Sequence, residues 1–340
     1  GPSFVEGAAP MVLRPLDLAT YVEAPRKRRR ESAPDNSTWL LIDPLLQRHK
    51  HPHRRHSECP ERIACMQAAL EEAGLAARCS VITCQNEASD EALALVHSTH
   101  YVRRLNTLRK ADAQRLQDEA EQYEDIYLNE HSIGCARLAA GGVLRMAEAL
   151  WAGTMRNGLA LVRPAGHHAG VHGPSGFCLL NNVAVAARQL VQQGCRRVLI
   201  VDWDVHHGDG TQQIFLDEDK VLFFSLHRRG NVFPFRGRAN AAPTVVGRSA
   251  GAGYTVNVAW EQGGMGDAEY AYAWDHLLLP LVRKWQPQVV LVSAGFDAAH
   301  GDPLGDCHVT PAGFARMTRA LKAEMGGKIL LALEGGYNRQ

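Results

Sequence analysis

Short, uninterrupted apolar segments recur along the second half of the chain and constrain its fold more than any other feature. They are residues 198–201 (Val-Leu-Ile-Val), 221–224 (Val-Leu-Phe-Phe), 289–292 (Val-Val-Leu-Val) and 329–332 (Ile-Leu-Leu-Ala). Strands buried on both faces of a parallel sheet show such continuous runs, whereas strands with one solvated face alternate. Segments with helical spacing at 183–193, 267–284 and 311–325 separate several of them. This alternation predicts an α/β fold, with helices covering both faces of a central parallel sheet.

The first half of the chain predicts further elements of the same layout. Apolar segments at 39–42 and 159–162 are expected strands, and helical spacing occurs at 63–73, 90–97, 99–109, 111–121 and 132–152. We find no internal repeat and no second independent core, so we expect residues 39–340 to form one domain. Residues 1–38 are rich in proline and charge without periodicity, and they predict a flexible tail.

Composition narrows the class of protein. The 340 residues carry 37 Lys+Arg and 36 Asp+Glu, a formal net charge of +1, so we expect no direct binding to nucleic acid. No apolar run approaches the ~18 residues of a membrane span, and we expect no membrane association. The eight cysteines contain no C-x-x-C pair and predict reduced thiols in an intracellular protein, in the nucleus, the cytoplasm or both. The basic run 26–30 fits nuclear import and a merely solvated tail equally well.

A His- and Arg-rich segment lies between the first predicted strand and the first predicted helix. Its histidines at 49, 51, 53 and 56 raise the question of a metal site. Because their surroundings are basic and without periodicity, we interpret the segment as a solvated loop.

Chemically active side chains follow several of the apolar runs. Ligands bind at the carboxyl ends of strands in open parallel sheets, so these positions are the ones to inspect. They hold Asp202, Asp204, His206 and Asp209 after 198–201, Asp297 after 289–292, His167 and His168 after 159–162, and Tyr337 after 329–332. We expect these side chains to converge at one edge of the sheet.

Asp204, His206 and Asp297 are the expected ligands of one divalent ion. An Asp and a His two residues apart on an extended segment project to the same side, and Asp297 arrives from another strand end. Three ligands leave a position open for water, which suits Zn²⁺ or another first-row ion at a catalytic site. The alternative is that the carboxylates cap turns while His206 packs in the core, but this would bury unpaired charge at a high cost.

The adjacent residues His167 and His168 follow Gly166 in a Pro/Gly-rich loop, where neither has an apolar face to fill. We interpret them as acid–base groups near a metal-bound water. Each needs a partner for its other ring nitrogen, and Asp202 and Asp209 are the nearest unassigned carboxylates.

Taken together, these motifs resemble the zinc-dependent histone deacetylases, and within them the class II branch. The matching segments are Arg163-Pro164-Ala165-Gly166-His167-His168-Ala169, Gly176-Phe177-Cys178, Asp202 to Thr211, Ser225-Leu226-His227-Arg228, Ser293 to Ala299 and Leu333 to Asn338. The resemblance implies the arginase/deacetylase fold and hydrolysis of Nε-acetyl-lysine, on histones or other proteins, to lysine and acetate. Acetylated proteins are then the expected partners, and membership of a co-repressor complex stays open.

The resemblance also implies roles for individual residues. It implies zinc on Asp204, His206 and Asp297, and an oxyanion donor at Tyr337. It also implies acid–base work by His167 and His168, oriented by Asp202 and Asp209 respectively. It implies an acyl-lysine tunnel at Gly176, Phe177 and Phe233, and a structural potassium ion on Asp202, Asp204, Ser225 and the carbonyls of His206 and Leu226. Asp125 stands where class II relatives receive the substrate backbone amide.

Some positions depart from the family pattern or bear on rival functions. Ala165 replaces the usual second proline, and the sequence ends three residues after Tyr337, so we expect it to be truncated. A binuclear manganese site resembling arginase would need an Asp where Gly208 stands. A deacylase acting on acetylated polyamines would need an acidic residue where Leu304 stands. An inactive protein that only binds acyl-lysine would not need the predicted metal ligands, the paired histidines and Tyr337. This chain has all of them, which argues against that function.

Overall fold

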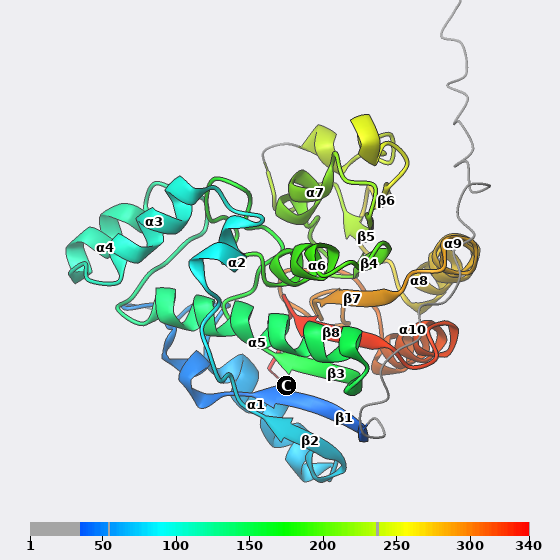
Figure 1. Ribbon diagram of the computed structural model, residues 1–340, viewed down its shortest axis with the longest axis horizontal. Helices are drawn as coiled ribbons and strands as arrows, with labels where there is room; N and C mark the ends of the chain where they lie inside the picture. The colour runs from blue at the N-terminus through cyan, green and yellow to red at the C-terminus, as the bar shows by residue number, and fades with distance from the viewer. Residues whose placement is uncertain (1–34, 54, 236–237, 340) are drawn as a thin grey trace, which may run out of the picture. The chain divides into compact units, whose positions relative to one another are not determined.

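The computed structural model describes residues 35–53, 55–235 and 238–339 (Figure 1). The basic run 26–30 and most of the expected tail therefore lie outside the described residues. Strand β1 spans Asp35–Ile42 and so begins before Trp39, the predicted start. Its ladder with the neighbouring strand extends back to Asp35, and the Thr38 hydroxyl donates to Asn157 Oδ1 at 2.7 Å.

Among the described residues, one sheet of eight parallel strands forms the centre of the domain, in the order β2-β1-β3-β8-β7-β4-β5-β6. The strands after β1 are β2 (Cys79–Ile82), β3 (Met155–Leu161), β4 (Val198–Asp202), β5 (Val221–Arg228), β6 (Thr255–Trp260), β7 (Val289–Ala294) and β8 (Ile329–Leu333). The predicted α/β fold with a central parallel sheet is confirmed. Because all strands run the same way, their carboxyl ends meet at one edge of the sheet.

Helices lie on both faces of this sheet (Figure 1). The helices of the described residues are α1 (Glu61–Glu72), α2 (Asp90–Ala94), α3 (Thr99–Leu108), α4 (Ala113–Ala120), α5 (Ser132–Ala152), α6 (Asn182–Gln192), α7 (Asp209–Phe215), α8 (Asp267–Ala273), α9 (Leu279–Trp285) and α10 (Pro311–Glu324), of which α3 and α4 lie to one side of the sheet. Ile200 and Phe223 pack into the apolar core that α5 and α6 share. Leu199 and Leu222, which point to the opposite face, pack with residues of α8, α9 and α10. Burial on both faces explains the continuous apolar runs in the sequence.

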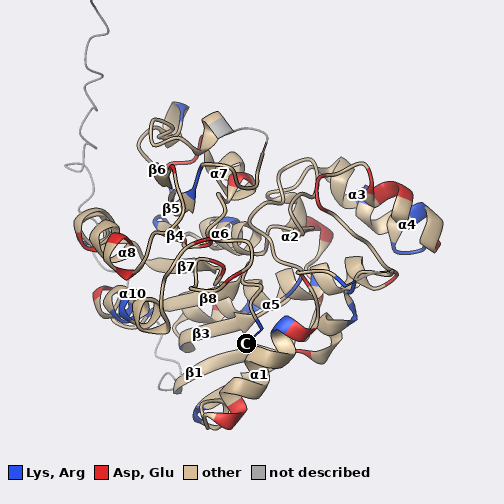
Figure 2. Ribbon diagram, turned by 180° about the vertical axis from the view of Figure 1, so that it is seen from behind, with Lys and Arg blue, Asp and Glu red and all other residues tan. Residues whose placement is uncertain are grey.

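Basic and acidic residues are interspersed along helices α1, α4 and α10, in keeping with the near-zero net charge (Figure 2). Within the part of the chain that the structure describes, no helix is long and apolar enough to cross a membrane.

One prediction about local structure is wrong, and another holds with an added detail. Residues 267–285 are helical, as predicted for 267–284, but they include a π-helical turn, Trp274–Leu278, just before Pro280, which has no amide hydrogen to donate to a regular helical turn. His49 is not in a solvated loop: its side chain is 1% exposed, its Nδ1 lies 2.8 Å from the Ser132 hydroxyl, and its ring stacks on Tyr127. Tyr127 and Ser132, which lie far along the chain, account for the burial of His49, and no local sequence pattern could show these contacts.

Candidate metal and catalytic site

Asp204, His206 and Asp297 come together at the carboxyl ends of β4 and β7, which are neighbours in the sheet. His206 Nδ1 lies 3.0 Å from Asp204 Oδ1 and 3.0 Å from Asp297 Oδ2. One candidate ligand atom from each residue lies within 4.8 Å of the others, and all three residues are buried. The adjacent strand ends thus bring together the three side chains that the sequence singled out.

Backbone amides hold these carboxylates in place. Val205 N donates to Asp297 Oδ1 and Gly335 N donates to Asp204 Oδ2, both at 2.8 Å. A Cβ atom at Gly335 would lie 2.0 Å from Asp297 Oδ2, so this position accepts only glycine without a shift of the metal-site carboxylate. The turn after β8 therefore packs directly against the acidic cluster.

The two buried carboxylates of the cluster repel each other, and a bound cation would offset this repulsion. Burial, together with the charge of Asp204, raises the pKa of Asp297 to about 7. Burial opposes the charged form of His206, but Asp297 and Asp204 outweigh it and raise the pKa of this histidine to about 10. Two carboxylates and an imidazole, all buried, form the donor set that a divalent first-row ion prefers.

His167 and His168 lie beside this cluster, and each has the carboxylate partner that it needs. His167 Nδ1 is 3.0 Å from Asp202 Oδ2, and His168 Nδ1 is 2.7 Å from Asp209 Oδ1. Burial disfavours a charged His167, yet Asp204 and Asp202 outweigh it and hold its pKa well above the usual range. Burial and the neighbouring His167 lower the pKa of His168 to about 4. The carboxylates around His167 thus favour its charged form, whereas burial favours the neutral form of His168.

A cavity of about 430 Å³ opens above the cluster, with His206 in its lining, and reaches solvent. Its lining combines metal-site and tunnel residues: His168, Gly176, Phe177, His206, Phe233, Leu304, Tyr337 and Asp125 are among them. The Phe233 ring lies 4.7 Å from the His168 ring, and the Phe177 ring lies 5.9 Å from the Tyr337 ring. Both phenylalanines therefore belong to the cavity wall, each beside another residue of the lining.

The wall that carries Phe177 depends on an unusual backbone. Gly176 and Phe177 both have positive φ, +50° and +66°, and a Cβ at Gly176 would lie 2.5 Å from the Phe233 ring. Phe177 N donates to the backbone carbonyl of Asp125 at 2.8 Å. The Asp125 side chain is exposed at the mouth, and its main chain supports the Phe177 wall.

The residues expected to hold potassium gather at the end of β5. Ser225 is directly opposite Asp202 across the β4–β5 ladder, and Ser225 and Leu226 are both buried. The Ser225 hydroxyl lies 2.8 Å from His227 Nδ1. This geometry does not test the potassium site, which stays a prediction.

Comparison with known proteins assigns the chain to a family. A model described as the histone deacetylase domain matches residues 56–340. Histone deacetylase 5 of Arabidopsis thaliana is 45% identical over 307 residues, which cover 88% of this chain and 46% of that protein. The chain belongs to the histone deacetylase domain family. Its relatives fit the class II branch that the motifs resemble.

Two further relatives extend this comparison. The polyamine deacetylase HDAC10 of Rattus norvegicus is 47% identical over 280 residues, covering 82% of this chain and 47% of that protein. The crystal structure of the HDA15 HD domain superposes with a TM-score of 0.81 at 43% identity, covering 89% of this chain and 84% of that one. The deacetylase domain described here thus spans about half the length of the curated relatives it matches.

Some residues around the site were not predicted from the sequence. The Glu334 carboxylate accepts hydrogen bonds from Gly166 N and His167 N, at 2.6 and 3.1 Å, and so fixes the loop of the paired histidines. Asp302 accepts hydrogen bonds from the backbone of the Tyr337 segment. The acidic residue in a strand-end motif was the available signal for Glu334, but nothing local marked Asp302.

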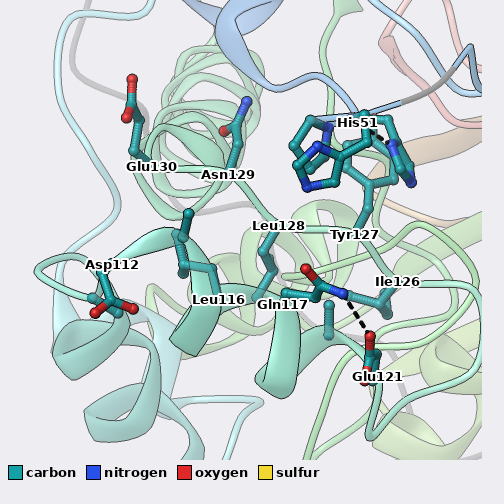
Figure 3. A pocket seen from close by; sticks show the side chains of 15 residues that line it. His51, Asp112, Leu116, Gln117, Glu121, Ile126, Tyr127, Leu128, Asn129 and Glu130 are labelled. Atoms are coloured by element: carbon teal, nitrogen blue, oxygen red, sulfur yellow. Dashed lines mark hydrogen bonds between the residues drawn. The ribbon is translucent and has the colours of Figure 1, made fainter.

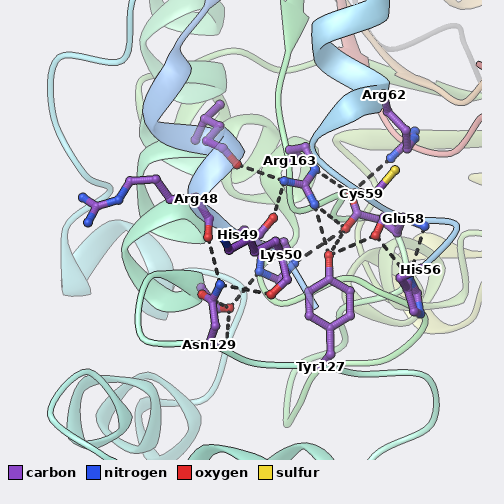
Figure 4. Close-up of polar contacts among 12 residues, drawn as sticks. Arg48, His49, Lys50, His56, Glu58, Cys59, Arg62, Tyr127, Asn129 and Arg163 are labelled. Carbon is purple, nitrogen blue, oxygen red and sulfur yellow. Dashed lines mark hydrogen bonds and ion pairs between the residues drawn. The ribbon is translucent and has the colours of Figure 1, made fainter. Parts of the chain in front are cut away.

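A buried ionic network lies behind the loop of the paired histidines (Figure 4). Arg163, 0% exposed, donates from Nε and Nη2 to the Glu58 carboxylate, both at 2.7 Å. Arg62 contacts the same carboxylate and also donates to the carbonyls of Gly336 and Glu334, at 2.6 and 2.5 Å. The charge of Arg163 outweighs burial and holds the pKa of Glu58 well below its usual range. The network ties the first turn of α1 to the loop of the paired histidines and to the Tyr337 segment.

A second hollow of about 440 Å³ lies between the His-rich loop and α4 (Figure 3). Its floor is apolar, with Leu116, Ile126 and Leu128, and His51 and Tyr127 form one wall. Tyr127 also belongs to the ionic network, through its hydroxyl contact with Glu58. None of the predicted metal or acid–base residues lines this hollow.

Proposed function

We propose that this domain, residues 39–340, is a zinc-dependent protein lysine deacetylase that hydrolyses Nε-acetyl-lysine to lysine and acetate. The observation that carries the proposal is the buried Asp204–His206–Asp297 cluster at the base of a solvent-connected cavity walled by two phenylalanines. An extended acyl-lysine side chain fits such a narrow apolar channel, with its amide at the polar end.

Zinc is the ion we assign to the cluster. Two carboxylates and one imidazole in a buried site leave an open position for water and the scissile carbonyl. A bound Zn²⁺ would polarise that carbonyl and acidify the water. We also keep the predicted potassium ion at Asp202, Asp204 and Ser225, with the carbonyls of His206 and Leu226, as part of the proposal.

His168 is the residue to which we assign the general base. It lines the cavity, whereas His167 does not, and its lowered pKa leaves it neutral and able to accept a proton at Nε2. Its Nδ1 is engaged by Asp209, which fixes the ring and supports the cation formed on proton transfer. The same ring then returns the proton to the leaving amine. His167 adjoins the His168 ring, with ring centroids 4.0 Å apart, and its Nδ1 is engaged by Asp202, so its pair with Asp202 supports the electrostatics of the site from beside the base.

Tyr337 is the residue to which we assign the oxyanion hydrogen bond. Burial raises the pKa of its phenol well above the usual range, so the hydroxyl stays protonated and can donate. Its position in the cavity lining, across from His168 and His206, suits this role.

The alternative substrate is a small acetylated polyamine, which the similarity to HDAC10 raises. Leu304 at the cavity mouth favours a peptide substrate, since it is 37% exposed and offers no charge to a distal ammonium group. Acetylated histone tails or other proteins, in the nucleus or cytoplasm, are therefore the proposed substrates, and a co-repressor complex stays a prediction.

A turnover assay on acetyl-lysine peptides and acetylspermidine tests the proposal. We expect higher kcat/KM on the peptide, and a loss of about 10²–10³ in kcat for Tyr337→Phe with zinc content and hydroxamate binding retained. Tyr272→Phe, at an exposed tyrosine, is the matched control and should leave kcat unchanged. Preference for acetylspermidine would overturn the substrate class, and a near-normal kcat in Tyr337→Phe would remove Tyr337 from the mechanism.

A further inference from the structure

We propose that Asp302 is a positioning residue that sets the place of the Tyr337 phenol and couples it to the rim of the cavity. The inference rests on the proposed function, because it concerns the oxyanion donor of that reaction. It assigns a role to a side chain that contacts neither the metal ligands nor the paired histidines.

One carboxylate joins two separate segments of the chain. Asp302 Oδ2 accepts hydrogen bonds from Tyr337 N at 2.6 Å and Asn338 N at 3.2 Å. Asp302 Oδ1 accepts hydrogen bonds from Leu304 N at 2.8 Å and Gly305 N at 3.2 Å. The side chain is 8% exposed, and no ion pair to it occurs among the described residues. Its charge is therefore directed at four backbone amides, and such hydrogen bonds are stronger than neutral ones.

Several hydrogen bonds fix the backbone that precedes Tyr337: Gly335 N donates to Asp204 Oδ2, and Gly335 O accepts from Phe296 N at 3.0 Å. Arg62 holds the carbonyls of Glu334 and Gly336, which precede the tyrosine. Gly336 has φ +114°, a conformation that only glycine adopts readily. The amide of Tyr337 itself is held by Asp302. A small rotation about this turn would be amplified at the phenol oxygen, the far end of the side chain.

The other half of the carboxylate fixes the rim. Leu304 lines the cavity, and its amide is bound by the same side chain that binds Tyr337. The next residue, Gly305, is anchored in turn, since its carbonyl accepts from Arg228 Nη1 at 2.9 Å. The Asp302 carboxylate thus transmits a shift of the rim loop to the amide of Tyr337, beside a second contact in which Asn338 Nδ2 donates to Gly301 O at 3.0 Å. This coupling predicts an effect of rim contacts on kcat as well as on KM.

The Asp302→Asn variant tests this role. It keeps the size of the side chain, but it removes the charge and places an NH₂ group where an oxygen accepted two amides. We expect kcat on an acetyl-lysine peptide to fall about 10- to 100-fold, because misplacing a reacting group by about 1 Å costs up to 10². KM, zinc content and hydroxamate affinity should change less than about threefold. A kcat within threefold of wild type would overturn the proposal.

A second comparison separates positioning from general stabilisation. Asp43 is the matched control: it is 2% exposed, and its two oxygens accept from Leu45 N and Cys84 N, each at 2.9 Å. Asp43→Asn therefore removes a similar bridge between two segments that do not carry Tyr337. We expect it to lower Tm while leaving kcat near wild type. An equal loss of kcat in both variants would overturn the assignment.

The double variant with Tyr337→Phe gives the sharpest result. If Asp302 acts through the Tyr337 hydroxyl, its substitution has little left to disturb in a chain that already carries Tyr337→Phe. The double variant should then have a kcat no more than about twofold below that of Tyr337→Phe alone. Losses that multiply would show that Asp302 acts elsewhere. Asp302→Ser serves as a second variant if Asp302→Asn does not fold, and failure of both to fold would assign Asp302 a purely structural role. An inactive wild type would instead refute the proposed function, before any variant is compared.

Discussion

Replacing Glu58 by glutamine should destabilise the domain severely, because it leaves the buried Arg163 guanidinium without a counter-charge. Both side chains are 0% exposed, and the guanidinium makes two hydrogen bonds of 2.7 Å to the carboxylate. Arg62 and the Tyr127 hydroxyl contact the same carboxylate, so a single substitution disturbs several groups at once (Figure 4).

The expected magnitude follows from this burial. Breaking a buried ion pair by neutralising one partner costs about 3–5 kcal/mol, because the other charge stays desolvated. An exposed pair contributes only about 0–1 kcal/mol. Arg283 and Glu324 form such an exposed pair, with side chains 59% and 24% exposed, and Glu324→Gln is the matched control.

Urea unfolding at neutral pH, followed by circular dichroism, measures both variants. We expect a loss of about 3–5 kcal/mol for Glu58→Gln and less than about 1 kcal/mol for Glu324→Gln. The double variant Glu58→Leu with Arg163→Met should recover part of the loss, since it leaves less unpaired charge. A cost for Glu58→Gln no larger than that of the control would refute the reasoning.

Three further predictions concern the metal, the rim and acid sensitivity. Asp297→Asn should strip zinc and abolish turnover, because it removes a charged ligand from a three-ligand site; full metal content by elemental analysis would contradict the ligand assignment. Leu304→Glu should raise the ratio of kcat/KM for acetylspermidine over that for acetyl-lysine peptide, since a carboxylate at the mouth can pair with a distal ammonium; an unchanged ratio would remove Leu304 from specificity. Burial lowers the pKa of His97 to about 4, and its ring donates to Gly170 O and accepts from Asn181 N as a neutral group. The unfolded state therefore binds a proton that the folded state does not between pH 6.5 and 4, so stability should be full above pH 6.5 and fall as the pH drops. Its contribution is about 1.4 kcal/mol per pH unit, and His97→Gln should flatten the slope of unfolding free energy against pH by that amount; identical slopes would show that His97 is not buried neutral.

The elements that could be predicted are those whose burial is uniform along the chain. Strands β4, β5, β7 and β8 are central and buried on both faces, so their apolar runs identify them without ambiguity. Strands β2 and β6 lie at the edges of the sheet and are partly exposed, and they show no such run. The short helix α7 was missed because it begins at Asp209, inside the motif that we interpreted as chemistry.

The residues of the candidate site also fall into those that the sequence could predict and those that it could not. The order of residues after each strand was enough to select Asp204, His206 and Asp297 and to expect them at one edge of the sheet. It could not select Asp302, whose partners come from two loops, or the pairing of Glu58 with Arg163, which are 105 residues apart.

The sequence alone therefore determined which central segments are strands, which edge of the sheet carries the predicted site and which side chains can serve as ligands, acids and bases. Periodicity and strand-end position are local properties, and a chain displays them before it folds. Only the tertiary structure decided which carboxylate fixes the loop of the paired histidines, which charges neutralise each other behind the loops, and what holds the Tyr337 backbone. Those depend on hydrogen bonds between distant segments, such as Arg62 and Gly336, 274 residues apart, whose geometry exists only once the sheet has brought the strand ends together.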